Sequence, residues 1–302
     1  MSNRFRSTGL PLTAALIWGT AFVVQSVLGK LIPPLMVNAL RSVIAALTVY
    51  LSILIFRFAE KKKGAVPQKQ DRRALIIGGI CTGAALTVAS NLQQAGLMYT
   101  SAGKASFITA LYTVLVPLVG LLLGKRISRQ VWLAVVLATV GLYLISITGA
   151  DGFSMEKGDF LVFLCAFGYT AHVLLIDHFT KTVDGLHLSL VQFITCAVLS
   201  GILSLLTETA DFSSLPVGEW LWPLLYIGVF SSGVAFTLQI LAQKGGDPTV
   251  VSLFLSLESV FGAIAGALLL HERMSPREIT GCVLMFTAVI LTQIPLKKAA
   301  ER

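Results

Sequence analysis

Ten apolar segments occupy almost the whole chain and limit what it can fold into. Each is about 20 residues long, and a helix of that length spans roughly 30 Å, the thickness of the hydrocarbon layer of a membrane. The segments are continuously apolar instead of alternating, which favours helices over barrel strands. Lipid offers no partners to backbone N–H and C=O groups, so helices that satisfy their own groups are required. The segments are 9–28, 35–56, 74–96, 103–124, 130–148, 159–177, 187–207, 220–242, 249–270 and 278–295.

The composition agrees with a membrane protein. Of the 302 residues, 55% are hydrophobic and 13% are charged, whereas a soluble globular protein has about twice that charged share. A net charge of +8 would suggest a nucleic-acid partner in a polar protein, but here it fits basic loops beside an anionic membrane surface. The sequence therefore predicts an all-α integral membrane protein of ten transmembrane helices. Its expected partner is the lipid bilayer, and no nucleic-acid partner is expected.

The basic residues predict the orientation. Cytoplasmic loops carry an excess of Lys and Arg, and the most basic connection is "EKKKGAVPQKQDRR" at 60–73. Placing the N-terminus inside puts this loop and most of the basic residues on the cytoplasmic side. The outer side then carries only Lys30, Lys104, Lys157, Arg273 and Arg277. We expect a multi-pass protein of the plasma membrane with both termini in the cytoplasm.

An internal repeat divides the chain. "LLLGKRIS" at 121–128 recurs as "LLLHERMS" at 268–275, and a shift of 147 residues also places Phe107 on Phe254 and Leu144 on Leu291. This predicts two five-helix repeats, residues 1–149 and 150–302. Because five is odd, the second repeat enters the membrane inverted. Inverted repeats are typical of secondary transporters, whose substrate site lies between the repeats near the midplane of the bilayer.

Several motifs together resemble one known family. "WGTAF", "NLQQAGLMYTSAGKASFITALYTVLVPL", "GKRIS" and "LSLESVFGAIAGALLLHERMS" are similar to the EamA-type members of the drug/metabolite transporter superfamily, and the resemblance covers essentially the whole chain. It implies a bacterial inner-membrane carrier without an ATPase domain, in which two repeats rock around a central cavity. Many such carriers export amino acids or other small metabolites. The motifs identify the superfamily and do not name a substrate.

Two charged residues lie inside apolar segments. Arg41 in "NALRSVIAAL" should face a cavity or a partner, because charge in the membrane costs several kcal/mol. It could clamp a substrate carboxylate or another anion, with Asn38 on the same face, or it could form a structural ion pair or extend toward the surface. Glu258 in "LSLESVFG" could take up and release a proton during transport, or it could bond a neighbouring helix permanently.

Buried amides and aromatic rings supply the remaining candidates. Amides inside the membrane need partners from protein or substrate, and aromatic rings with a few amides could enclose an amphiphilic metabolite. The alternatives are structural: Trp and Tyr also settle at membrane interfaces, and His172 could be a satisfied helix histidine instead of a proton relay. The predicted substrate-binding residues are Trp18, Gln25, Asn38, Arg41, Asn91, Gln94, Tyr112, Tyr169, His172 and Gln239, with Glu258 for proton coupling.

Enzyme and metal motifs are lacking from the sequence. "SAGKAS" has the wrong spacing for a phosphate-binding loop, and the four His residues do not cluster as metal ligands. We therefore expect no catalytic residues, no metal and no cofactor. The predicted function is secondary active transport of a small organic metabolite, outward, driven by a proton gradient or by exchange. The alternatives are a carrier of nucleotide sugars or other anionic metabolites, and a membrane sensor or enzyme. A homodimer is compatible with the sequence, which does not fix the oligomeric state.

Overall fold

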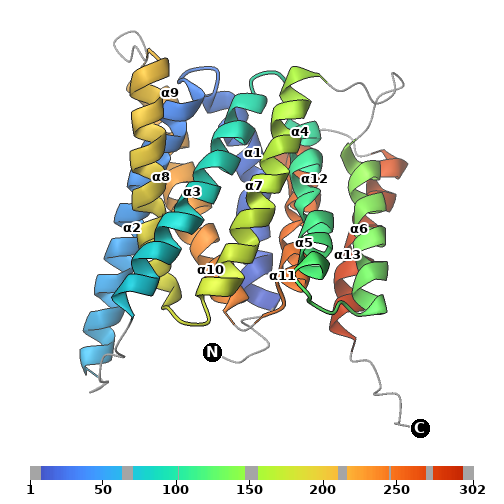
Figure 1. The fold of residues 1–302 in the computed structure, drawn as a ribbon. Helices are drawn as coiled ribbons and strands as arrows, with labels where there is room; N and C mark the ends of the chain where they lie inside the picture. Colours follow the sequence, from blue (N-terminus) through green and yellow to red (C-terminus); the bar gives the residue numbers. More distant parts are fainter. Residues whose placement is uncertain are drawn as a thin grey trace.

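The apolar segments form a bundle of helices (Figure 1). The computed structural model describes residues 8–62, 71–100, 102–146, 156–209, 216–244, 246–269 and 275–294, and these ranges contain no strand. The helices of the first half are α1 (Leu10–Leu28), α2 (Pro34–Lys62), α3 (Arg72–Gly96), α4 (Ala102–Ala110), α5 (Tyr112–Leu122) and α6 (Arg129–Ser146). The predicted all-helical class is confirmed.

The second half begins at α7 and contains two interrupted segments, and the first half contains one, α4 with α5. Its elements are α7 (Lys157–Phe179), α8 (Gly185–Thr207), α9 (Val217–Tyr226), the π-helix η2 (Ile227–Phe236), α10 (Thr237–Gln243), α11 (Pro248–Leu255), α12 (Glu258–Leu269) and α13 (Pro276–Gln293). We call the consecutive pieces the α4–α5 arm, the α9–η2–α10 arm and the α11–α12 arm. Within the described residues, eight helical spans are long and apolar enough to cross a membrane, which is fewer than the ten expected.

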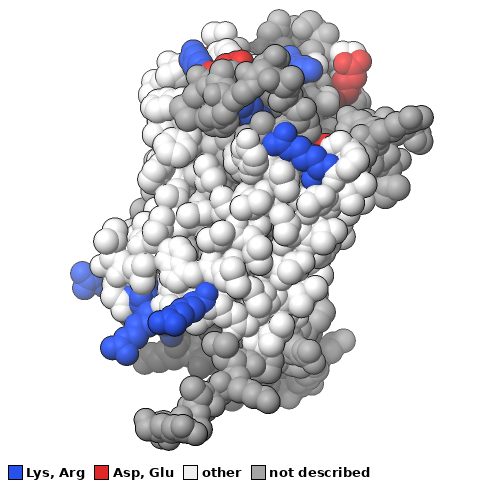
Figure 2. Space-filling view, turned by 90° about the vertical axis from the view of Figure 1, so that its right-hand side faces the viewer, with Lys and Arg blue, Asp and Glu red and all other residues white. Residues whose placement is uncertain are grey.

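The surface has the distribution of charge expected beside lipid. On the face in Figure 2, charged side chains gather toward the two ends, and the wide band between them is uncharged. Many large apolar side chains are exposed, among them Leu47 at 58%, Leu122 at 86% and Val283 at 58%. A soluble protein would bury most of these side chains, whereas lipid solvates them.

Short polar side chains start several helices at the ends of the bundle. Asp71, Asp184 and Asp247 each accept two backbone N–H bonds from the first turn of α3, α8 and α11. Ser275 and Glu278 form a reciprocal capping box at the start of α13. These caps satisfy N–H groups that have no partner within a helix. The sequence therefore places these four helix starts at the ends of the bundle, where polar groups meet water.

The two halves pack in a repeated pattern. α3 of the first half packs on α7 of the second half, and the α9–η2–α10 arm of the second half packs on α1 of the first half. The corresponding pairs α2 with α8 and α6 with α13 pack directly against each other. In Figure 1, α1 runs upward from Leu10 while α7 runs downward to Phe179, and α6 and α13 are also antiparallel. Corresponding helices thus run in opposite directions.

Close backbone contact joins α1 to α12. A Cβ atom added at Gly19 would lie 2.7 Å from the carbonyl oxygen of Glu258 and 2.7 Å from the backbone nitrogen of Gly262. Backbone atoms cannot move aside as a flexible side chain can. Small residues at such crossings let membrane helices approach closely and gain dispersion contacts.

Replacing Gly19 by alanine is expected to destabilise the protein by about 1–3 kcal/mol, since the added methyl group overpacks a backbone contact. The measurement is the midpoint of thermal unfolding in detergent. Gly218→Ala is the matched control, because nothing lies within 4 Å of a Cβ atom at that helical position. An equal effect of the two substitutions would contradict the close approach of α1 and α12.

Candidate functional site

A cavity lies between the two halves of the bundle, and the space free of atoms there is about 460 Å³ when the adjoining open solvent is included. Both halves contribute its walls, since α1, α2, α3 and the α4–α5 arm come from the first half and the other lining elements from the second. Its lining is mostly aromatic and amide side chains, with one basic and one acidic residue. The lining residues are Trp18, Phe22, Gln25, Arg41, Gln93, Thr109, Tyr112, Tyr169, Val173, Ser231, Phe236, Gln239 and Glu258.

Arg41 is held in place by neutral partners. Its Nε donates to Ser232 Oγ at 2.7 Å, and its Nη1 donates to Gln25 Oε1 at 2.7 Å. The side chain is only 5% exposed, and within the described part of the chain it has no ion pair with a carboxylate. Two bonds fix the guanidinium plane and leave further N–H donors in the cavity wall. Because a buried cation without an anion is costly, this arrangement favours an anionic group as ligand.

Glu258 is the acidic counterpart. It begins α12, is 4% exposed and lines the same cavity. Among the described residues, its carboxylate has no hydrogen bond or ion pair, so Arg41 and Glu258 do not neutralise each other. The cavity therefore presents opposite charges from α2 and α12, each available to a ligand or, at the carboxylate, to a proton.

Aromatic rings line the cavity together with the two charged groups. Trp18 and Phe236 stack edge to face with their ring centroids 4.7 Å apart, and the indole Nε1 donates to the carbonyl oxygen of Ser231 at 2.9 Å. Ser231 belongs to the π-helix, and wide turns of this kind occur often at functional sites. The ring centroids of Tyr112 and Tyr169 lie 6.3 Å apart, with the two rings tilted relative to each other. Such rings can pack against an apolar side chain or a cation.

A chain of hydrogen bonds fixes another part of the wall. Tyr169 Oη donates to Gln93 Oε1 at 3.1 Å, and Gln93 Nε2 donates to Thr109 Oγ1 at 3.1 Å. These three residues belong to α7, α3 and α4. The chain satisfies the amide of Gln93 inside the bundle, so this wall keeps its shape without a ligand.

Two helical segments break beside the cavity at matching positions. The α4–α5 arm is interrupted at Leu111, and the α11–α12 arm is interrupted just before Glu258. A shift of 147 residues places Leu111 on Glu258. The two arms meet across the centre, where the hydroxyls of Ser106 and Ser259 lie 2.7 Å apart. Discontinuous helices at corresponding places in two repeats are typical of binding sites in secondary transporters.

The comparison with family models decides the family. The model of the EamA-like transporter family matches the chain twice, over residues 9–147 and 156–294. The chain belongs to the EamA-like transporter family. This confirms the resemblance noted from the motifs, and together with the helical spans it makes the chain a multi-pass membrane protein.

Individual EamA-like relatives extend over most of the chain. An uncharacterized transporter of Archaeoglobus fulgidus is 28% identical over 96% of this chain and 86% of its own length. The uncharacterized transporter YoaV of Bacillus subtilis is 22% identical over 93% of this chain and 94% of its own. One solved crystal structure matches with a TM-score of 0.76 at 19% identity, covering 95% of this chain and 96% of that one. At that identity the likeness concerns the fold alone.

Most of the side chains expected at the substrate site of this EamA-like protein lie around the one cavity. The residues on its lining are Trp18, Gln25, Arg41, Tyr112, Tyr169, Gln239 and Glu258. Gln25 also orients Arg41, because its amide oxygen accepts a hydrogen bond from the guanidinium. Their roles in binding and coupling stay predictions.

Four other expected residues are not on that lining. Asn38 Nδ2 donates to the carbonyl oxygen of Ser90 and to Asn91 Oδ1, both at 2.9 Å. Gln94 Nε2 donates to the backbone oxygen of Gln25 at 3.1 Å. His172 Nε2 lies 2.8 Å from Gln192 Oε1. These side chains join helices to one another, which is the structural alternative for a buried polar group.

Some lining residues carry no clear signal in the sequence. Gln93 lies between two expected amides, Asn91 and Gln94, but successive helical residues point about 100° apart, so only packing decides which amide faces the cavity. Thr109 lies next to the break in the α4–α5 arm, and Ser231 lies in the π-helix. The first arm contains a Pro signal near its break, since Pro117 removes a backbone bond in α5 six residues after Leu111. The described part of the second arm has no equivalent signal in its sequence.

Proposed function

We propose that this EamA-like protein is a secondary active transporter of a small zwitterionic metabolite, an amino acid or a similar compound. It would span the bacterial inner membrane ten times in two inverted repeats, with both termini in the cytoplasm. The cavity between the repeats would open to one side at a time. Transport would be outward, coupled to protons or to exchange.

The observation that carries the proposal is the pair of unneutralised charges in one cavity. Arg41 offers a guanidinium whose orientation is fixed by Gln25 and Ser232, and Glu258 offers a carboxylate on the same cavity. A zwitterion bridging them would place its carboxylate on Arg41 and its ammonium near Glu258. Each buried charge would then be compensated by the ligand, which recovers part of the cost of desolvation.

Proton coupling follows from the same carboxylate. A carboxylate that binds an ammonium cannot carry a proton at the same time. Protonation of Glu258 would therefore release the ammonium end of the substrate, and release of the proton would restore the site. This competition links the two fluxes without any nucleotide.

A carrier of nucleotide sugars is less well supported. Such a substrate has two phosphates, which are usually bound by several basic side chains. Among the lining residues, Arg41 is the one Lys or Arg. The carboxylate of Glu258 would also repel a phosphate.

Purified protein in liposomes tests the proposal by counterflow. Liposomes preloaded with one unlabelled amino acid are expected to accumulate the labelled compound transiently, because alternating access exchanges substrate across the bilayer. A panel should include amino acids, their amides and amines, and related carboxylic acids. Loss of either charged group from the compound should reduce flux. A protein that exchanges none of the zwitterions would contradict the proposed substrate class.

A further inference from the structure

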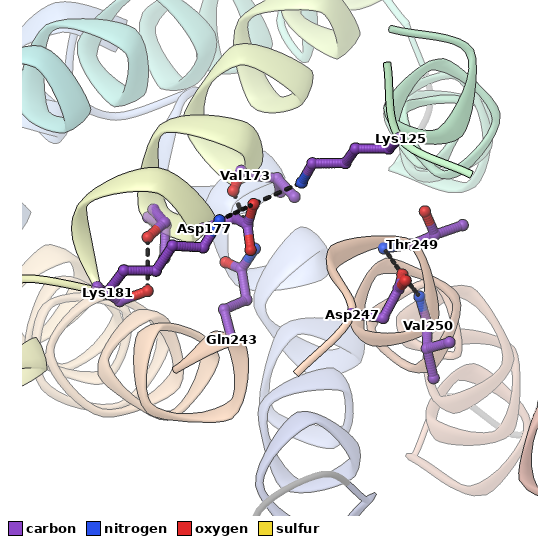
Figure 3. A network of polar contacts seen from close by, with 10 residues as sticks. Lys125, Val173, Asp177, Lys181, Gln243, Asp247, Thr249 and Val250 are labelled. Atoms are coloured by element: carbon purple, nitrogen blue, oxygen red, sulfur yellow. Dashed lines mark hydrogen bonds and ion pairs between the residues drawn. The ribbon is translucent and has the colours of Figure 1, made fainter. Parts of the chain in front are cut away.

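Two helical arms from different halves are joined by an ion pair at one end of the cavity. Lys125 Nζ lies 2.5 Å from Asp177 Oδ2, and Figure 3 shows the lysine reaching from the α4–α5 arm to α7. The position of Lys125 depends on Gly124, whose φ of +79° favours glycine. This turn lets the N–H of Lys125 bond to the carbonyl oxygen of Gly120 at 2.9 Å. The helix end thus directs the ammonium across the contact, which we call the α5–α7 seam.

A second pair joins the same two arms at the other end. Lys104 Nζ lies 2.5 Å from Asp159 Oδ2, with the lysine on α4 and the aspartate at the start of α7. In both pairs the lysine belongs to the first half and the aspartate to the second. Asp159 also accepts bonds from Thr100 Oγ1 at 2.6 Å and from the backbone N–H of Glu156 at 2.9 Å.

The cavity lies between these two pairs. Thr109 and Tyr112 line it from the α4–α5 arm, and Tyr169 and Val173 line it from α7. Separation of the arms at either end would therefore connect the cavity to that end of the molecule. The same two helical segments therefore carry an ion pair at each end of the cavity.

At the end that carries Lys125, two amide side chains also close the cavity. Gln243 Nε2 donates to the backbone oxygen of Val173 at 2.9 Å, one turn from Asp177 (Figure 3). Gln239, on the cavity lining, donates to Gln243 Oε1 at 3.3 Å. Both amides are buried, so hydrogen-bonded side chains close this end of the cavity near the ion pair.

The contact that corresponds to this seam in the other half is built differently. There α1 packs on the α11–α12 arm through Gly19 and Gly262, whose backbones almost touch. Within the described ranges no ion pair crosses it. A close contact of small residues has no long side chains that must separate, so it can act as a pivot, whereas polar pairs at the ends of a seam can break and re-form in water.

We propose that the α5–α7 seam is the one that opens, and that Lys125 and Asp177 form the latch at its lower end in Figure 1, the end that carries Leu10 and Phe179. Lys104 and Asp159 form the latch at the opposite end. Lys125 is partly exposed, so water can solvate both ions when the latch breaks, as a reversible gate requires. The proposal rests on the transporter function proposed above, but opening of the seam can be measured without any substrate.

The test uses a cysteine on the cavity lining. In protein whose four native cysteines (Cys81, Cys165, Cys196 and Cys282) are replaced by alanine, Val173→Cys reports access to the cavity. A membrane-impermeant thiol reagent is added from the side on which Lys125 lies. Breaking the latch with Lys125→Gln or Asp177→Asn is expected to raise the labelling rate about fivefold, the effect of one partly exposed ion pair on a two-state equilibrium.

Two controls make the result specific to the seam. Lys181 lies 3.4 Å from the same carboxylate, but it belongs to the turn just after α7 and its ion pair does not cross the seam, so Lys181→Gln should leave the labelling rate unchanged. The charge exchange Lys125→Asp with Asp177→Lys should return the rate to that of the parent. An unchanged rate in both latch variants, an equal rise in Lys181→Gln, or no recovery in the exchanged pair would overturn the proposal. Failure of counterflow alone would instead contradict the proposed substrate, since labelling does not depend on it.

Discussion

Arg41→Ala is expected to lower the affinity for a zwitterionic substrate by about 100-fold or more, as loss of one partner of a buried charge pair usually does. The guanidinium is fixed by Ser232 and Gln25 at 2.7 Å each, so it is ready to bind a carboxylate without further ordering. Arg41→Lys keeps the charge but lacks the planar fork, so it should recover only part of the affinity. The measurement is the ligand-induced rise in melting temperature across a panel of amino acids.

Arg57→Ala is the matched control for this substitution. Arg57 lies on the same helix α2, but it is exposed and near His187, with 3.0 Å between Arg57 Nη2 and His187 Nε2. Removing it takes the same charge from the helix without touching the cavity, so affinity should not change. Parental affinity in Arg41→Ala, in protein that still folds and inserts, would remove Arg41 from the site.

Glu258→Gln is expected to make flux independent of an imposed pH gradient. Glutamine keeps the size of the side chain but cannot exchange a proton, and Glu258 is the one acidic residue on the described cavity lining. Binding of substrates with an ammonium should also weaken, by about tenfold for the loss of one charge-assisted contact. The measurement is counterflow and gradient-driven uptake at several internal and external pH values in the same liposomes.

The control for Glu258 is Glu219→Gln. Glu219 is an exposed residue in the first turn of α9, so its neutralisation should leave the pH dependence as it is in the parent. A parental response to the gradient in Glu258→Gln would end the coupling role. In that case the carboxylate would serve the substrate only, and exchange would be the driving process.

The two charged residues could be found from sequence because the membrane makes them conspicuous. A charge within a long apolar segment needs a partner or a cavity wherever the helix lies. The amides gave a weaker signal. Asn38 and Asn91 bond each other between helices, while Gln93, next to the expected Gln94, reaches the cavity. All of these amides lie in similar apolar helices. Whether an amide faces the cavity or a neighbouring helix depends on residues more than fifty positions away in the sequence.

The sequence by itself determined the helical class, the two repeats and the family, because each depends on sums along the chain: apolar length, basic loops and similarity at a fixed shift. Only the tertiary structure decided which polar residues share one cavity, where the arms break, and that Lys125 meets Asp177 across the two halves. Those outcomes depend on how distant segments pack. There a few atomic contacts decide which of two neighbouring side chains faces the cavity or a partner.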